Sequence, residues 1–137
     1  MYKRQAYDGI GALLDRLRDE GAVLAVATSK RRYLAEQILD HYGLRDRFTV
    51  VAGAHDDGSG GGKHEVVERV VAELDPPDGA TVFMIGDRDS DLRAGQSHGA
   101  SAIGVRWGYA RPGELEAVDG ATLVATMDEL ATELLGR

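Results

Sequence analysis

Two aspartates follow a short apolar stretch in the C-terminal half of the chain. Residues 81–85 (TVFMI) are mostly apolar, Gly86 permits a tight turn, and Asp87 and Asp91 follow it four positions apart. From a strand tip and the first turn of a helix, the two carboxylates could face one point. Oxygen donors without a neighbouring histidine or cysteine suit Mg²⁺, which keeps waters and substrate phosphate as further ligands. The alternative is that these acids, with Asp89 between them, cap a helix and interact with its dipole.

Two other positions carry groups that suit a phosphate. Thr28, Ser29 and Lys30 follow the apolar run of residues 22–27, where a hydroxyl and backbone N–H groups at a helix start could hold an anion; the alternative is an ordinary N-cap. Lys63 begins a helix after the glycine-rich loop of residues 55–62. A lysine there opposes the helix dipole, so we expect an anion beside it unless it is a solvated surface residue.

Apolar periodicity indicates the elements that position these groups. Helical spacing predicts helices near residues 10–17, 34–42, 63–74 and 87–98, and apolar runs predict strands at residues 22–27, 48–52, 81–85 and 101–105. Thr126 and Glu129 form a capping-box pattern for a last helix. The alternation predicts one α/β domain with a mostly parallel sheet, whose strand ends bring the candidate groups to one edge.

Composition excludes several classes of protein. The formal net charge of -7 over 137 residues gives no electrostatic footprint for nucleic acid or an anionic membrane. The absence of cysteine excludes disulfides, a catalytic thiol and a thiolate metal site, and fits a reducing cytoplasm. No apolar run approaches the ~20 residues of a membrane span, and the N-terminus does not resemble a signal peptide. We therefore expect a cytoplasmic protein that binds neither nucleic acid nor membrane.

The N-terminal residues read differently from the rest. Residues 2–5 form a polar tag before a sequence that begins abruptly at a helix, and the same four residues are encoded by a common transposase sequencing adapter. We expect residues 1–5 to be a non-native leader and residues 6–137 to be a partial core domain. A short native lead-in is the alternative.

The motifs together resemble the haloacid dehalogenase (HAD) superfamily, in its phosphoglycolate phosphatase-like branch. The resemblance rests on a strand ending at Thr28, a helix-start Lys63 and the Gly86-Asp87 turn with Asp91, in that order. It extends from about residue 7 to the end, with further matches at residues 38–44 (ILDHYGL), 51–59 (VAGAHDDGS) and 105–115 (VRWGYARPGEL). It implies a Rossmann-like three-layer core.

The resemblance also implies roles for these residues. Thr28, with Ser29, would bind a transferring phosphoryl oxygen, and Lys63 would neutralise the phosphoryl group and orient the nucleophile. Asp87 and Asp91 would hold Mg²⁺. The implied activity is Mg²⁺-dependent hydrolysis of a small phosphorylated metabolite such as phosphoglycolate, a nucleoside monophosphate or a sugar phosphate.

The chain departs from the family pattern at its start. The family's nucleophile lies in an Asp-x-Asp-Gly-Thr motif at the end of the first strand, followed by a cap domain, and neither is present. The nearest match, residues 6–10, has Ala6 at the nucleophile position. We expect the chain alone to be inactive. We also expect the central strand to be missing between the strands that end at Thr28 and Asp87, which leaves unpaired edges that could self-associate.

Two other functions share part of this pattern. A catalytically dead HAD-fold domain could serve as a binding or regulatory module, and an Asp-x-Asp-Gly-Thr motif upstream would favour the enzyme instead. A receiver domain shares the acidic strand ends and the lysine. It does not fit, because the middle strand that should end in a phosphoaccepting aspartate ends in Gly53 and Ala54.

Overall fold

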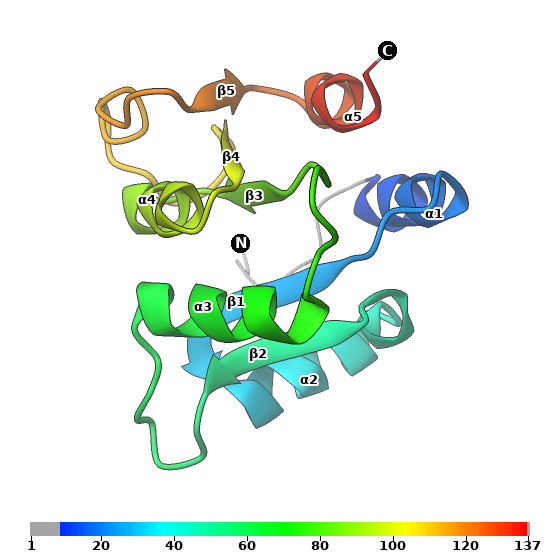
Figure 1. Ribbon diagram of the computed structural model, residues 1–137, viewed down its shortest axis with the longest axis vertical. Helices are drawn as coiled ribbons and strands as arrows, with labels where there is room; N and C mark the ends of the chain where they lie inside the picture. The colour runs from blue at the N-terminus through cyan, green and yellow to red at the C-terminus, as the bar shows by residue number, and fades with distance from the viewer. Residues whose placement is uncertain (1–8, 137) are drawn as a thin grey trace.

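The computed structural model describes residues 9–136, in which helices and strands alternate (Figure 1). The predicted leader at residues 1–5 lies outside the described residues. The elements are, in order, α1 (Ile10–Asp19), β1 (Ala25–Arg31), α2 (Arg32–His41), the 3-10 turn η1 (Arg45–Arg47), β2 (Val50–Ala54), α3 (Lys63–Leu74), β3 (Phe83–Gly86), α4 (Asp89–Ser97), β4 (Ser101–Val105), β5 (Thr122–Val124) and α5 (Met127–Leu135). The predicted α/β class is confirmed.

The strands form two separate parallel sheets. β1 pairs with β2 in one sheet, and the other has the order β3-β4-β5. Within residues 9–136 no ladder joins β1 to β3, and Figure 1 shows the two sheets apart. Among the described residues, β1 and β3 each have a paired neighbour on one side only, and the expected central strand between them stays a prediction.

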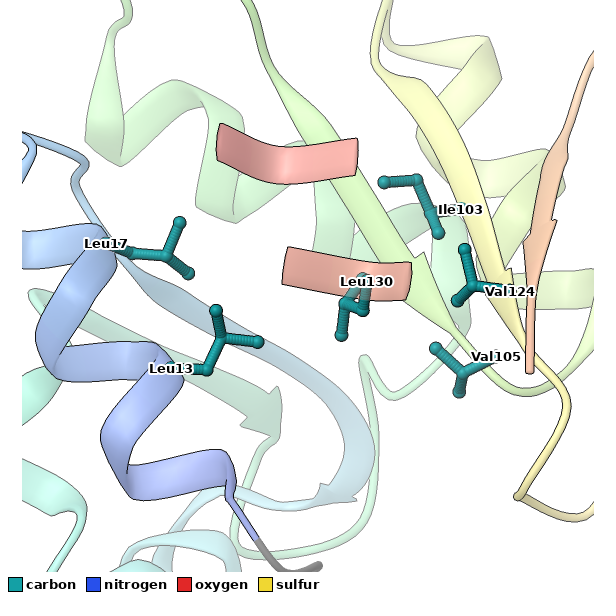
Figure 2. Close-up of a cluster of buried hydrophobic side chains, with 6 residues drawn as sticks. All are labelled: Leu13, Leu17, Ile103, Val105, Val124 and Leu130. Atoms are coloured by element: carbon teal, nitrogen blue, oxygen red, sulfur yellow. The ribbon is translucent and has the colours of Figure 1, made fainter. Parts of the chain in front are cut away.

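Helices cover the sheets on both faces, which gives the three layers expected. α3 packs on β1 and β2, α4 packs on β3 and β4, and the two helices contact each other. On the opposite face, α1 and α5 meet β4 and β5 in an apolar cluster, shown in Figure 2: Leu13, Leu17, Ile103, Val105, Val124 and Leu130. Adjacent residues of β4 face opposite layers, since Ala102 belongs to the cluster under α4.

Two strands begin later than predicted, because each begins only where its neighbouring strand is present to pair with it. β1 begins at Ala25 rather than residue 22 because its partner β2 begins only at Val50. β3 begins at Phe83, opposite the first residue of β4. The strand β5 was not predicted at all. Its three residues are too few to show a period in the sequence.

The predicted glycine stop after the first helix is confirmed, and the predicted capping box of the last helix is confirmed in part. Gly21 follows α1 with φ 90°, a left-handed conformation that suits glycine after a helix. At α5, the Thr126 hydroxyl accepts a hydrogen bond from the Glu129 N–H at 3.1 Å. The Glu129 carboxylate accepts from the N–H of Ala125 rather than from Thr126, so only half of the predicted capping box forms. None of the helices in residues 9–136 is long and apolar enough to cross a membrane.

Candidate active site

The turn between β3 and α4 holds the two candidate metal ligands in fixed positions. Asp87 Oδ2 accepts a hydrogen bond from the N–H of Tyr109 at 2.8 Å, and Asp91 Oδ2 accepts one from the N–H of Arg88 at 3.3 Å. Each carboxylate also lies against a glycine. A Cβ at Gly86 would overlap the Asp91 side chain, and a Cβ at Gly108 would overlap that of Asp87. The glycines therefore give the two carboxylates their space.

Lys63 connects this turn to the other sheet. Its Nζ lies 2.8 Å from Asp91 Oδ1 and donates a hydrogen bond to the carbonyl oxygen of Ala27 at 3.3 Å. The two side chains are only 15% and 12% exposed, so the charges meet in a largely desolvated place. The anion expected beside a lysine at a helix start is thus Asp91. From the start of α3, the Lys63 side chain contacts both β1 and α4, and so links the two sheets.

The second candidate group lies in a different element from the one predicted. We expected Thr28 and Ser29 at a helix start, but both lie within β1, and α2 begins only at Arg32. The reason is a bulge: Ala27 pairs with Ala52 and Arg31 with Ala54, so four steps along β1 oppose two along β2. Thr28 is half-buried and its hydroxyl accepts from the N–H of Lys30 at 3.1 Å, while Ser29 is exposed.

A clamped loop leads into Lys63. Arg69, on α3, donates from Nη2 to the carbonyl oxygens of Gly53 at 2.6 Å and Gly60 at 3.0 Å, which ties the last part of β2 and the glycine-rich loop to the helix. Inside the loop, Asp57 accepts hydrogen bonds from the N–H and hydroxyl of Ser59, and these bonds lower its pKa. The loop is therefore held although three consecutive glycines give it little intrinsic rigidity.

Sequence reasoning missed Glu114, which lies beside the carboxylate turn. Its Oε2 accepts from Arg88 Nε at 2.8 Å and from the N–H of Asp89 at 2.9 Å, and its Oε1 accepts from the N–H of Arg111 at 3.1 Å. The Arg88 hydrogen bond is the largest cause that lowers the pKa of Glu114 to about 2. Residue 114 lies in the stretch 105–115 that matches the family, but the resemblance assigned no role to Glu114. The side chain of Asp89 is 42% exposed, which agrees with its assignment as a helix-start residue.

The donor set at this turn fits Mg²⁺ better than a softer metal. Within residues 9–136 no group of three histidine, cysteine or acidic side chains gathers to hold a metal by itself. Asp87 and Asp91 offer carboxylate oxygens only. Mg²⁺ commonly binds through one or two carboxylates and completes its shell with water and substrate phosphate, so two acids suffice.

Comparisons with known proteins found similar sequences and structures. The family model of haloacid dehalogenase-like hydrolases matches residues 2–99. The tyrosine-protein kinase PtkA of Mycobacterium tuberculosis is 42% identical over 131 residues, which cover 93% of this chain and 44% of PtkA. Its solved structure superposes with a TM-score of 0.80. A phosphoglycolate phosphatase of Xanthomonas campestris pv. campestris is 30% identical over 105 residues, which cover 77% of this chain and 47% of that protein.

A second solved structure adds a geometric likeness over nearly the whole chain. The crystal structure of a predicted phosphatase from Clostridium acetobutylicum superposes with a TM-score of 0.88 at 34% identity, over 96% of this chain and 60% of that one. The chain thus spans about half the length of the curated relatives it matches. The family match over residues 2–99, together with these relatives, shows that the chain belongs to the haloacid dehalogenase-like hydrolase family.

Proposed function

We propose that this chain is the phosphate- and magnesium-binding part of a Mg²⁺-dependent phosphomonoester hydrolase that acts on small phosphorylated metabolites. The observation that carries the proposal is the Lys63–Asp91 ion pair, 2.8 Å long and nearly desolvated, between the first turns of α3 and α4. A paired lysine and acid beside a second, separately held carboxylate can bind both a phosphoryl group and its metal ion. Phosphoglycolate, a nucleoside monophosphate or a sugar phosphate would each suit such a site.

Each residue has a distinct task in this proposal. Lys63 neutralises the phosphoryl oxygens and orients the nucleophile, and the Thr28 hydroxyl, with Ser29, hydrogen-bonds a phosphoryl oxygen beside the irregular part of β1. Asp87 and Asp91 hold Mg²⁺, which when bound offsets the negative charge that gathers on the phosphoryl group. Their oxygens are already oriented by the backbone N–H groups of Tyr109 and Arg88, so little reorganisation is needed.

The nucleophile must come from outside these residues. In the proposed reaction a carboxylate attacks phosphorus while the ester oxygen leaves, and water then hydrolyses the acyl phosphate. Within residues 9–136, Asp87 and Asp91 are engaged as described, and no strand lies between β1 and β3 to present another. The chain alone is therefore inactive in this proposal, and its two open edges favour self-association. A cysteine-free, acidic chain suits the cytoplasm and does not suit nucleic acid or membranes as partners.

Turnover of p-nitrophenyl phosphate with Mg²⁺ tests the proposal. The comparison is between this chain and a longer version that carries an Asp-x-Asp-Gly-Thr segment upstream, taken from the source gene or a relative. We expect activity only in the longer version, and a loss of several orders of magnitude when its nucleophile is changed to asparagine. Mg²⁺-dependent activity of the 137 residues that disappears in Asp87→Asn would place the nucleophile inside the chain and contradict the proposal.

The identity to PtkA favours a second candidate function. PtkA bears the name tyrosine-protein kinase and is 42% identical to this chain. The same phosphate- and metal-binding residues would serve if a tyrosine hydroxyl, rather than water, accepted the phosphoryl group. Incubation of the longer version with Mg²⁺-ATP and a tyrosine-containing peptide separates the two functions. Phosphotyrosine on the peptide favours the kinase. An unmodified peptide, together with release of inorganic phosphate from p-nitrophenyl phosphate in a parallel assay, favours the hydrolase.

A further inference from the structure

The loop after β4 is fastened to the carboxylate turn at several points. Tyr109 donates its N–H to Asp87, and Glu114 accepts from the N–H of Asp89 and from Arg88 Nε on the turn. Glu114 also accepts from the N–H of Arg111 in its own loop. Two oxygens of one side chain thus receive three donors from two segments that lie far apart in the sequence.

The surroundings make Glu114 well suited to hold this geometry. Its side chain is 10% exposed, whereas the Arg88 side chain is 43% exposed, so the carboxylate is the inner partner of the pair. Hydrogen bonds to an ionised carboxylate are shorter and stronger than neutral ones. The low pKa of Glu114 means that the ionised form, which accepts all three bonds, prevails near neutral pH.

We propose that Glu114 is a positioning residue that fixes the turn from Asp87 to Asp91 and thereby sets the affinity of these two aspartates for a divalent cation. It touches neither metal nor substrate. It acts on the backbone between the two ligands, because it holds the N–H of Asp89, midway between them, and the side chain of Arg88, whose own N–H binds Asp91. The inference rests on the proposed metal-binding role of Asp87 and Asp91.

The test compares Glu114→Gln with Glu116→Gln in the ¹⁵N-labelled chain. Glu116 is a matched control: it is two residues away and paired with an arginine, Arg106, at 2.6 Å, but that pair lies apart from the turn. Mn²⁺ is the probe, read by paramagnetic broadening of the amide signals of residues 86–91, and amide hydrogen exchange of Asp89 is the second readout. Melting temperatures of both variants are recorded.

We expect Glu114→Gln to weaken Mn²⁺ binding at least tenfold and to speed exchange of the Asp89 amide at least tenfold. The control substitution Glu116→Gln should change neither by more than twofold. A merely structural role would lower the melting temperature and leave the Mn²⁺ affinity of the folded protein unchanged. Binding in Glu114→Gln within twofold of the unsubstituted chain would overturn the proposal.

The proposed metal site and the proposed role of Glu114 are contradicted by different results. If Mn²⁺ broadens no signal of residues 86–91 in the unsubstituted chain, the proposed metal site is wrong. The exchange of the Asp89 amide then decides the role of Glu114 by itself: an unchanged rate in Glu114→Gln overturns it, and a tenfold faster rate keeps it as the residue that fixes the turn.

Discussion

At the scale of single residues, glycines at contact points give the two aspartates their positions. A Cβ at residue 108 would overlap Cβ, Cγ and Oδ2 of Asp87. We therefore expect Gly108→Ala to lower the free energy of unfolding by about 1–3 kcal/mol through overpacking. The control is Gly11→Ala in α1, where the nearest atom to a new Cβ is Leu44 Cδ2 at 3.8 Å. Alanine there should stabilise by about 0.5–1 kcal/mol. Urea denaturation measures both, and equal effects would refute the steric argument.

The Lys63–Asp91 pair should show strong energetic coupling. Lys63→Met leaves the Asp91 carboxylate in place without its cation, which we expect to cost about 1–3 kcal/mol. Because Asp91→Asn removes the same interaction, the double variant should lose clearly less than the sum of the single variants. The control is Arg93→Met, whose pairing with Asp89 at 4.0 Å is about half exposed and should contribute nothing measurable. Additive losses in the double-mutant cycle at Lys63 and Asp91 would show that the contact does not couple them.

Glu114 should make stability depend on acid pH. The hydrogen bonds it accepts lower its pKa from an ordinary 4.5 to about 2 in the folded chain. A carboxyl group with a depressed folded pKa contributes stability above its unfolded pKa and loses it as pH falls through the folded pKa. The gap in unfolding free energy between the chain and Glu114→Gln should therefore be constant from pH 7 to about 5 and shrink towards about pH 2. A gap that grows on acidification would contradict the assignment.

At the scale of elements, Arg69 links a helix to a loop that sequence composition alone marks as mobile. Its Nη2 holds the carbonyl oxygens of Gly53 and Gly60. We expect Arg69→Met to release the loop of residues 55–62, so that subtilisin cleaves within it at least tenfold faster while the melting temperature falls only slightly. Arg93→Met is again the control, since it lies on α4 away from this loop. Cleavage at the original rate would mean that the loop is held by its internal turn instead.

The elements also show which parts of the fold were readable from sequence. The bounds of β4 and the starts of α1 and α3 follow directly from apolar spacing and from breaks at glycine. The strand that carries Thr28 continues to Arg31, beyond its predicted end, because a bulge depends on its pairing partner, which no local pattern records. Residue types at Lys63 and Asp91 suggested their chemistry, but their 2.8 Å contact arises from the packing of α3 against α4. The role of Glu114 could not be predicted from the sequence, because two of its three hydrogen-bond donors are backbone N–H groups, which nearly every residue has.

At the scale of the whole molecule, the interval between the two sheets is the dominant feature. β1 and β3 each lack a neighbour on one side within the described residues, and Lys63 spans the interval from Ala27 to Asp91. The chain spans about half the length of these curated relatives. In our proposal, one strand supplied between β1 and β3 would complete both the strand pairing and the chemistry of the site.

Unpaired edges with apolar side chains should make the isolated chain associate with itself. Phe83 and Ile85, alternate residues of β3, are 37% and 39% exposed although strands of a three-layer fold normally bury such side chains. We expect Phe83→Thr/Ile85→Thr to be monomeric by sedimentation velocity at concentrations where the unsubstituted chain forms oligomers, because threonine keeps strand propensity without the apolar surface.

The control for this experiment is Val23→Thr, which removes an even more exposed apolar side chain, 63% exposed, from a position before β1. It should leave association unchanged, because general surface hydrophobicity is not the cause. The longer version with its upstream strand should also be monomeric, since that strand would pair with β1 and β3 and cover Phe83 and Ile85. An unsubstituted chain that stays monomeric at high concentration, with slow amide exchange along β3, would mean that the two sheets close on each other in solution.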